Sequence, residues 1–158
     1  MGSRNDTHRA RDTRQPLQAR LTVRADTGAM PQVEAFVGSF ATQHGIETDD
    51  TARVIILLEE LFTNLVKYGY PTQSEPGWAD IGLELEGTRL TIEFVDDGRA
   101  FDPLAQPAPN LDRRLEDRSP GGLGLHILRG LPEEAHYSRS NDRNVIRLTR
   151  RVALIHRP

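Results

Sequence analysis

The hydrophobic positions of the chain change their period several times, and each period predicts one element. Over Leu17–Val23 apolar and polar residues alternate, which predicts a half-buried strand. Over Ala29–His44 apolar residues recur every three or four positions, which predicts an amphipathic helix. A wider apolar stripe predicts a second helix that Thr48 or Asp49 caps and that runs to about Tyr68.

The second half of the chain predicts strands in hairpins around a long irregular loop, residues 96–122. The predicted strands and the short helix are, in order, Ala79–Leu85, Leu90–Val95, a helix over Leu123–Leu131, Ala135–Ser140 and Asn144–Arg150. This order of elements predicts an α+β fold. We expect a two-layer α/β sandwich, in which helices cover one face of a mostly antiparallel mixed sheet.

Composition and charge limit the kinds of partner that the chain can have. The 158 residues suffice for one domain with a proper core, and the net charge of −3 indicates neither nucleic acid nor an anionic membrane. The absence of cysteine excludes disulfides and thiolate metal sites. The longest apolar run, Val54–Leu58, is far shorter than the roughly 20 residues that span a bilayer. We therefore expect a cytoplasmic protein.

Domain boundaries follow from the same composition. Residues 1–15 are polar and dense in charge, without the apolar segment of a signal peptide, and we expect a disordered tail there. Residues 16–152 contain all the predicted strands and helices, and we expect them to form a single domain.

Three short blocks carry the candidate chemistry: Glu59–Tyr70 (EELFTNLVKYGY), Val95–Pro103 (VDDGRAFDP) and Gly121–Gly130 (GGLGLHILRG). In the first block Glu60 and Asn64 lie four residues apart, and therefore on one side of the second helix. A carboxylate and an amide among leucines are costly without partners. A functional interpretation makes Asn64 a Mg²⁺ ligand and Glu60 a group that orients or deprotonates a nucleophile. The alternative is two solvated polar residues on the helix surface.

The other two blocks each have a structural and a functional interpretation. Asp96 follows a strand and precedes Asp97-Gly98, a favoured turn pair. A carboxylate at a strand end can also accept a hydrogen bond from an adenine amino group, while Gly98 leaves room for the purine. The glycines of the third block either give a loop flexibility or expose backbone N–H groups to phosphate at a helix N-terminus. Neither a Walker lysine pattern nor a dinucleotide-binding glycine motif is present in the sequence.

In order and spacing the three blocks resemble the N, G1 and G2 boxes of the GHKL (Bergerat-fold) ATPases, which include gyrase, Hsp90, histidine kinases and MutL. The resemblance covers about Leu17 to Arg150, and it includes the order strand, helix, N box, hairpin, G1 box, lid, G2 box, hairpin. Within this superfamily the chain most resembles the small bacterial anti-sigma regulatory factors that are serine/threonine protein kinases. The resemblance implies the Bergerat fold and the cofactors ATP and Mg²⁺.

The resemblance also implies roles for single residues. Glu60 matches the N-box glutamate that is proposed as catalytic base, and Asn64 matches the metal ligand at the nucleotide. Asp96 matches the aspartate that reads adenine, and residues 101–121 match the ATP lid. The other implied nucleotide-binding residues are Gly98, Ala100 and Phe101 in the G1 box and Gly121, Gly122, Leu123, Gly124 and Leu125 in the G2 box.

Two positions depart from the family pattern, and one cluster has two interpretations. Ala100 stands where the G1 box usually has its second glycine, and its methyl group would tighten the adenine pocket. Tyr68 stands where many relatives have histidine. In the lid, Arg113, Arg114 and Arg118 either reach phosphates or a partner, or they form a solvated run of charges.

Three functions remain open at this point. The first is an ATP-dependent serine/threonine protein kinase that phosphorylates a STAS-type anti-sigma factor antagonist. In its other state it would sequester a sigma factor, and so regulate transcription by partner switching. The second is a non-catalytic module in which ATP sets only the lid shape and the affinity for a partner, which the Ala100 departure and the short lid favour. The third is a domain that no longer binds nucleotide. As in relatives, we expect a homodimer, without direct contact with nucleic acid or membrane.

Overall fold

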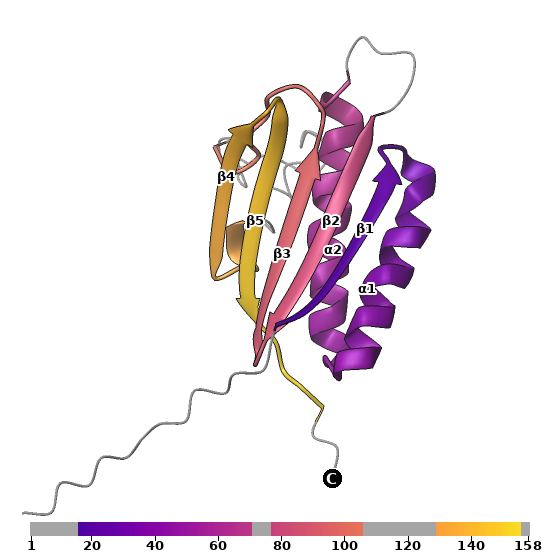
Figure 1. Cartoon of the computed structure of the whole chain (residues 1–158), viewed down its shortest axis with the longest axis vertical. Helices are drawn as coiled ribbons and strands as arrows, with labels where there is room; N and C mark the ends of the chain where they lie inside the picture. Colours follow the sequence, from indigo (N-terminus) through magenta and orange to yellow (C-terminus); the bar gives the residue numbers. More distant parts are fainter. Residues whose placement is uncertain (1–15, 71–76, 106–128, 156–158) are drawn as a thin grey trace, which may run out of the picture.

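Two helices lie against one face of a five-stranded antiparallel sheet (Figure 1). This computed structural model describes residues 16–70, 77–105 and 129–155. The strands, in sheet order, are β1 (Leu17–Arg24), β2 (Trp78–Glu86), β3 (Arg89–Asp96), β5 (Arg143–Arg151) and β4 (Glu134–Ser140), and the helices are α1 (Met30–His44) and α2 (Thr48–Tyr68). The predicted α+β two-layer fold is confirmed. The mixed component is not found, because all pairs among the described strands are antiparallel.

The predicted tail, all but the last two residues of the block Gly121–Gly130 and most of the predicted lid lie outside the described residues. None of the helices in the described part of the chain is both long and apolar enough to span a bilayer.

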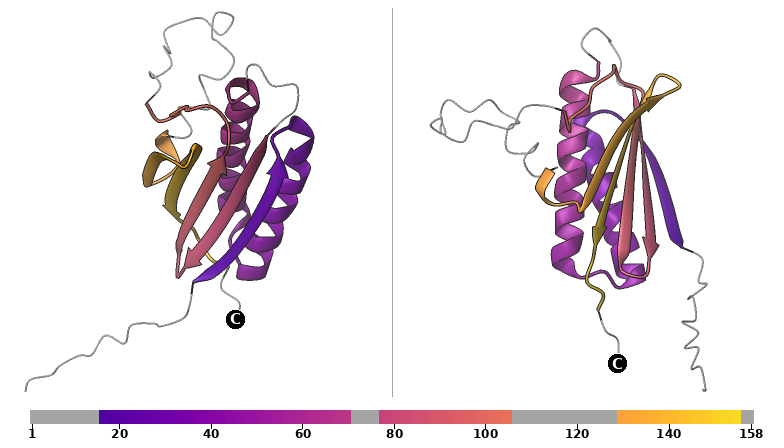
Figure 2. Two further views of the ribbon diagram at one scale, coloured as in Figure 1. Left: turned by 45° about the horizontal axis from the view of Figure 1, so that its top comes forward. Right: turned by 90° about the vertical axis from the view of Figure 1, so that its left-hand side faces the viewer.

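The core fills the space between the sheet and the helices, which lie on the same side of it (Figure 2). Alternation places Ile92 and Phe94 of β3 on the covered face, where each is at most 1% exposed. In β5 the matching positions are Ile146 and Leu148. Leu57, on the apolar stripe of α2, is fully buried in the same cluster. Because side chains alternate between the faces of a strand, residues that pair directly in neighbouring strands lie on the same face of the sheet.

The helix boundaries agree with the pattern except at the start of α2. Gly45 ends α1 with a left-handed φ of 69°, as the predicted glycine stop requires. The predicted cap of α2 is wrong, because Thr48 already has helical geometry and Glu47 precedes the helix without a capping side chain. Ile46 pairs with Leu154, and the Glu47 N–H donates to the Ala153 carbonyl. These contacts keep the chain extended as far as Glu47, so the helix begins immediately after it.

The C-terminal ends of α2 and β3 meet at one end of the molecule, at the top of Figure 1. The Arg99 N–H, just beyond β3, donates to the carbonyl of Gly69, just beyond α2, at 3.0 Å. A Cβ atom on Gly98 would lie 3.0 Å from the Gly69 Cα and 3.1 Å from a Leu65 methyl group. Glycine at 98 therefore permits the close approach of the two segments, and these segments form the walls of the candidate site.

A two-residue turn joins β4 to β5, and both of its residues, Asn141 and Asp142, have left-handed φ angles of 51° and 58°. Such turns prefer glycine at the second position, since an L side chain is strained there. We expect Asp142→Gly to raise the free energy of unfolding by about 0.5 kcal/mol. Urea unfolding would measure this gain. Ser138→Gly, within β4, is the matched control and should destabilise, and a loss of stability in Asp142→Gly would contradict the prediction.

Candidate functional site

A small cavity lies between the second half of α2 and the loop that follows β3. Its volume is about 20 Å³, room for roughly one water molecule. It is lined by Leu61, Asn64, Leu65, Gly69, Phe94, Asp96, Arg99, Phe101, Pro103, Asn144 and Ile146. The fold therefore brings together predicted residues from the first two blocks, namely Asn64, Asp96 and Phe101. A purine is larger than this cavity, so its entry requires movement of a wall.

Asp96 ends β3 and is 6% exposed. Its Oδ1 atom accepts hydrogen bonds from the Gly98 N–H at 2.9 Å and from the Asn144 side chain at 2.8 Å. Burial raises the pKa of this carboxyl group, and the two donors offset only part of that effect. The Asp96 side chain thus closes the turn to Gly98, as the structural interpretation expects, and it also lines the cavity. Its contact with adenine stays a prediction.

Asn144, near the start of β5, is a site residue that the sequence reasoning missed. It pairs with Asp96 across the sheet and is 3% exposed. Besides Asp96, its Nδ2 donates to the Arg99 carbonyl at 2.9 Å. Its Oδ1 accepts from the Tyr137 hydroxyl at 2.8 Å and from Arg139 at 2.9 Å. This buried amide therefore connects β3, the loop after β3 and β4.

Glu60 and Asn64 lie side by side on α2, as their spacing predicts. Asn64 is 5% exposed, so the alternative of two solvated residues does not fit it. Its Nδ2 donates to Glu60 Oε1 at 3.3 Å, which leaves the amide carbonyl oxygen available for a cation. Burial raises the pKa of the half-buried Glu60, while the bond from Asn64 and the charge of Lys67 act in the opposite direction. This acid is therefore a stronger base than a fully solvated glutamate.

Phe101 lines the cavity and contacts a second aromatic ring. Phe101 stacks on Tyr68 with ring centroids 5.5 Å apart and an interplanar angle of 27°. Its backbone N–H points to Asn144 Oδ1 at 3.4 Å. Ala100 precedes Phe101 and is exposed. The residue at the departure from the G1 pattern is thus adjacent to, and not among, the residues that line the cavity.

Asp97, the neighbour of Asp96, does not line this cavity. Its Oδ1 accepts hydrogen bonds from the Tyr70 hydroxyl and from the Trp78 N–H. Burial, together with the Asp97 carboxylate, raises the pKa of Tyr70 far above its ordinary value. Asp97 therefore joins the end of α2 to the start of β2, and the two adjacent aspartates have different roles.

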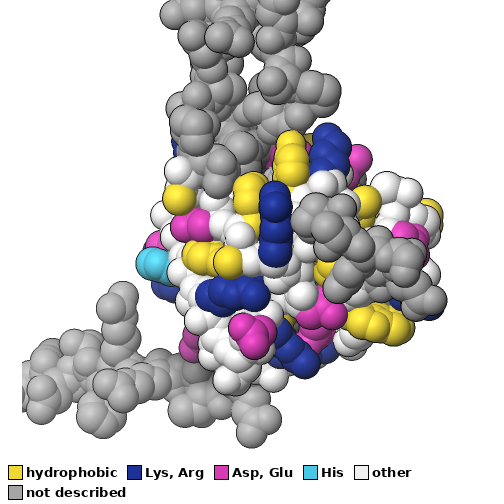
Figure 3. All heavy atoms as spheres, turned by 90° about the horizontal axis from the view of Figure 1, so that it is seen from above, with side chains coloured by type: hydrophobic (Ala, Val, Ile, Leu, Met, Phe, Trp, Pro, Cys, Tyr) yellow, Lys and Arg dark blue, Asp and Glu magenta, His cyan; other side chains and the backbone are white. Residues whose placement is uncertain are grey.

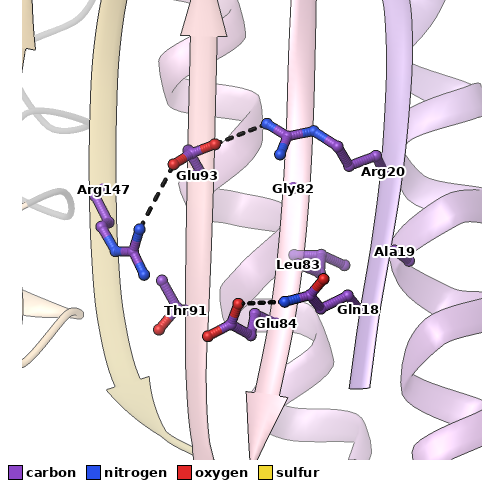
Figure 4. Close-up of a pocket in the computed structure, with 9 residues that line it drawn as sticks. All are labelled: Gln18, Ala19, Arg20, Gly82, Leu83, Glu84, Thr91, Glu93 and Arg147. Atoms are coloured by element: carbon purple, nitrogen blue, oxygen red, sulfur yellow. Dashed lines mark hydrogen bonds and ion pairs between the residues drawn. The ribbon is translucent and has the colours of Figure 1, made fainter. Parts of the chain in front are cut away.

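A larger hollow, of about 240 Å³, lies on the sheet face that the helices leave open (Figure 4). It exists because Gly82 lacks a side chain between Arg20 and Glu93. Arg20 and Arg147 both pair with Glu93, at 2.7 and 3.6 Å. These charges already have partners. Apolar walls comparable to those of the cavity at Asp96 are not found among the residues that line this hollow, so it is the weaker candidate for a purine.

The end of the molecule that carries the cavity has no single sign of charge. Figure 3 shows basic, acidic and hydrophobic side chains interspersed there among the described residues. No group of three or more histidine, cysteine, aspartate or glutamate side chains that could hold a metal ion is found in residues 16–70, 77–105 and 129–155.

The fold and a match to a family model define the class of this domain. The chain belongs to the family of histidine kinase-like ATPase domains, whose family model matches residues 23–150. The resemblance to GHKL proteins is thereby confirmed. The G2-box residues Gly121, Gly122, Leu123, Gly124 and Leu125 lie outside the described part of the chain, and their role stays a prediction.

Several curated relatives are named as protein kinases. The serine/threonine-protein kinase BtrW of Bordetella bronchiseptica is 34% identical over 93 residues, which cover 58% of this chain and 63% of BtrW. The serine-protein kinase RsbW of Bacillus licheniformis is 27% identical over 106 residues, which cover 63% of this chain and 65% of RsbW. The chain thus spans less than two thirds of the length of these relatives.

Two further comparisons extend this result. The anti-sigma F factor of Thermoanaerobacter pseudethanolicus is 25% identical over 99 residues, which cover 62% of this chain and 67% of that factor. In a crystal structure of the RsbU and RsbW domains of Rv1364c from Mycobacterium tuberculosis, the similar region covers 86% of this chain and 32% of that one. The TM-score is 0.61 at 20% sequence identity. This last likeness is one of fold.

Proposed function

We propose that the chain is an ATP-dependent serine/threonine protein kinase of the anti-sigma type. It would phosphorylate a STAS-type anti-sigma factor antagonist, and in its other state it would bind and sequester a sigma factor. The observation that carries this proposal is the Glu60–Asn64 pair, a half-buried carboxylate of raised pKa next to a buried amide whose carbonyl oxygen can bind a cation. The names of BtrW, RsbW and the anti-sigma F factor support the same function.

In this proposal each residue has one task. Asp96 accepts a hydrogen bond from the adenine amino group, and Asn64 holds Mg²⁺ through its carbonyl oxygen. Bound Mg²⁺ would neutralise charge on the transferred phosphoryl group. Glu60 accepts the proton of the incoming serine or threonine hydroxyl, so the oxygen becomes a better nucleophile. The order along α2 fits this division, because the helix rises by about 6 Å between residues four apart. Asp96, Asn64 and Glu60 would thus follow the nucleotide from base to phosphate.

Transfer of radiolabelled phosphate from ATP tests the proposal directly. The full chain would be incubated with Mg-ATP and with each candidate STAS-type protein from the same genome. We expect label on a serine or threonine of one antagonist and none on its alanine variant. Absence of label on every antagonist, under conditions in which ATP binds, would reject the kinase.

Asn64→Ala provides a test of the metal site. The variant lacks the carbonyl oxygen that would bind Mg²⁺, so we expect the affinity for Mg-ATP to fall by about tenfold. The affinity for ATP measured in EDTA should change little. Titration calorimetry with and without Mg²⁺ would separate the two effects. Thr63→Ala, one position earlier on α2, is the matched control and should keep both affinities. If Asn64→Ala lost as much affinity for ATP in EDTA as for Mg-ATP, a role of Asn64 in metal binding would be contradicted.

A non-catalytic module is the second candidate. The small cavity of about 20 Å³ favours it, since a purine cannot enter this space without movement of a wall. In that case Mg-ATP would change the affinity for a sigma factor, measured by calorimetry, without label appearing on any antagonist.

A further inference from the structure

The buried Asn144 side chain makes hydrogen bonds to Asp96, Arg99, Tyr137 and Arg139. Two of its contacts fix which end of the amide is which. The Arg99 carbonyl can only accept a hydrogen bond, and the Arg139 guanidinium can only donate one. The Nδ2 group must therefore face Arg99 and Asp96, and Oδ1 must face Arg139 and Tyr137. No flipped amide satisfies these partners.

This orientation determines which oxygen of Asp96 is available. Oδ1 receives two donors, the Gly98 N–H and Asn144 Nδ2. No hydrogen bond to Oδ2 is found within residues 16–70, 77–105 and 129–155. Among the described residues the carboxylate is therefore held through Oδ1, and Oδ2 is the oxygen that a ligand would meet. An oxygen that only accepts matches a base with an amino group and disfavours a base with a carbonyl oxygen at the same place.

Arg139 supports this arrangement from β4. Its Nη1 donates to Asn144 Oδ1 at 2.9 Å and to the Gly98 carbonyl at 3.1 Å. One guanidinium group thus holds both the amide and the turn whose N–H binds Asp96. The edge strand β4 is therefore connected to the Asp96 carboxylate through the Arg139 guanidinium and the Asn144 amide.

We infer that Asn144 is a positioning residue, which holds the Asp96 carboxylate so that one oxygen selects a purine with an amino group at position 6. The inference rests on the proposed nucleotide site and deepens it. Asn144 acts through Asp96, so it contributes mainly to the part of the affinity that depends on the amino group. A residue that only maintained the cavity would contribute equally to every purine.

A pair of nucleotides separates these two cases. One is ATP, and the other is purine riboside triphosphate, which has hydrogen in place of the 6-amino group. For the full chain with Mg²⁺, we expect calorimetry to give an affinity for ATP at least about tenfold above that for the analogue. In Asn144→Leu the affinity for ATP should fall by about tenfold and that for the analogue should change little, so their ratio approaches one. In Asn144→Thr, whose hydroxyl can still donate, part of the ratio should return.

Val145→Ala is the matched control, since Val145 is the next residue of β5 and lies on the opposite face. Its ratio should equal that of the unmodified chain. An equal loss of both affinities in Asn144→Leu would overturn the inference. If Asn144→Leu does not fold, Arg139→Met serves instead, because it leaves Asn144 in place and removes its main support. An unchanged ratio in Arg139→Met would also overturn it.

The outcome is separable from that of the proposed function. An unmodified chain that binds neither nucleotide refutes both proposals. Suppose instead that the chain binds ATP and labels an antagonist, but the ratio of its affinities for ATP and for purine riboside triphosphate does not change on substitution of Asn144. This result refutes only the role of Asn144.

Discussion

Replacement of Glu60 by glutamine should abolish phosphoryl transfer and leave the nucleotide bound. The glutamine would keep the length of the side chain and an oxygen that accepts from Asn64, but it cannot take a proton. General bases contribute typically 10²- to 10⁴-fold, so we expect the rate of antagonist labelling to fall by about that factor. The dissociation constant of Mg-ATP should change by less than about twofold. Single-turnover labelling and calorimetry would measure the two quantities separately.

The pH dependence of labelling gives a second measurement on the same residue. The base must be ionised, and burial raises the pKa of Glu60 above that of a solvated glutamate. The rate of labelling should therefore increase as the pH rises through this raised pKa. Any residual activity of Glu60→Gln should not show this increase. Glu59→Gln, at the exposed neighbouring position, is the control and should keep both rate and profile. Equal transfer by Glu60→Gln would remove Glu60 as the base.

The strands could be predicted from the sequence to within one or two residues. The expected strand Ala79–Leu85 is extended to Trp78 and Glu86 in the structure. Alternation reports which side chains face the core, and the terminal residues of a strand are defined instead by hydrogen bonds to neighbours. The cap of α2 could not be predicted for a similar reason, since pairing of Ile46 with Leu154 sets where the helix begins.

In the candidate site, too, contacts within one helix could be predicted from the sequence, whereas contacts between strands could not. Glu60 and Asn64 are neighbours through the helix alone, so their spacing was sufficient. Asn144 has the same parity as Ile146 and Leu148 in β5, a signal that it faces the core. Its contact with Asp96 depends on β5 lying beside β3 rather than only beside β4, and no periodicity in one strand reveals that order.

The small volume of the cavity also could not be predicted. Ala100 was expected to tighten an adenine pocket, but the residue of this loop segment that lines the cavity is its neighbour Phe101, which stacks on Tyr68. Tyr68 is the other departure from the family pattern, and it stacks on Phe101 through a ring face. The contact joins the end of α2 to the loop after β3. Whether the stack forms depends on the approach of these two segments, which Gly98 permits.

Asp96→Asn should lower nucleotide affinity without lowering stability. The asparagine oxygen can still accept from the Gly98 N–H and from Asn144, but an NH₂ group would replace the second carboxylate oxygen and face the amino group of adenine. Two donors in contact, in place of a charged hydrogen bond, should reduce ATP affinity by about 100-fold. Asp97→Asn is the matched control, since Asp97 lies outside the cavity, and its affinity should be unchanged. Calorimetry on the two variants gives the comparison.

The stability of the same variant should depend on pH in a defined direction. Burial raises the folded-state pKa of Asp96 above its ordinary value of 3.8, so the ionised form destabilises the fold. This cost is absent below pH 3.8, develops as the pH rises through the raised pKa, and is complete at neutral pH. An asparagine at this position would not carry it. The thermal midpoint of Asp96→Asn should therefore equal or exceed that of the unmodified chain at neutral pH, and this advantage should vanish in acid. If Asp96→Asn is less stable at neutral pH than the unmodified chain, the ionised carboxylate stabilises the fold, and the prediction is contradicted.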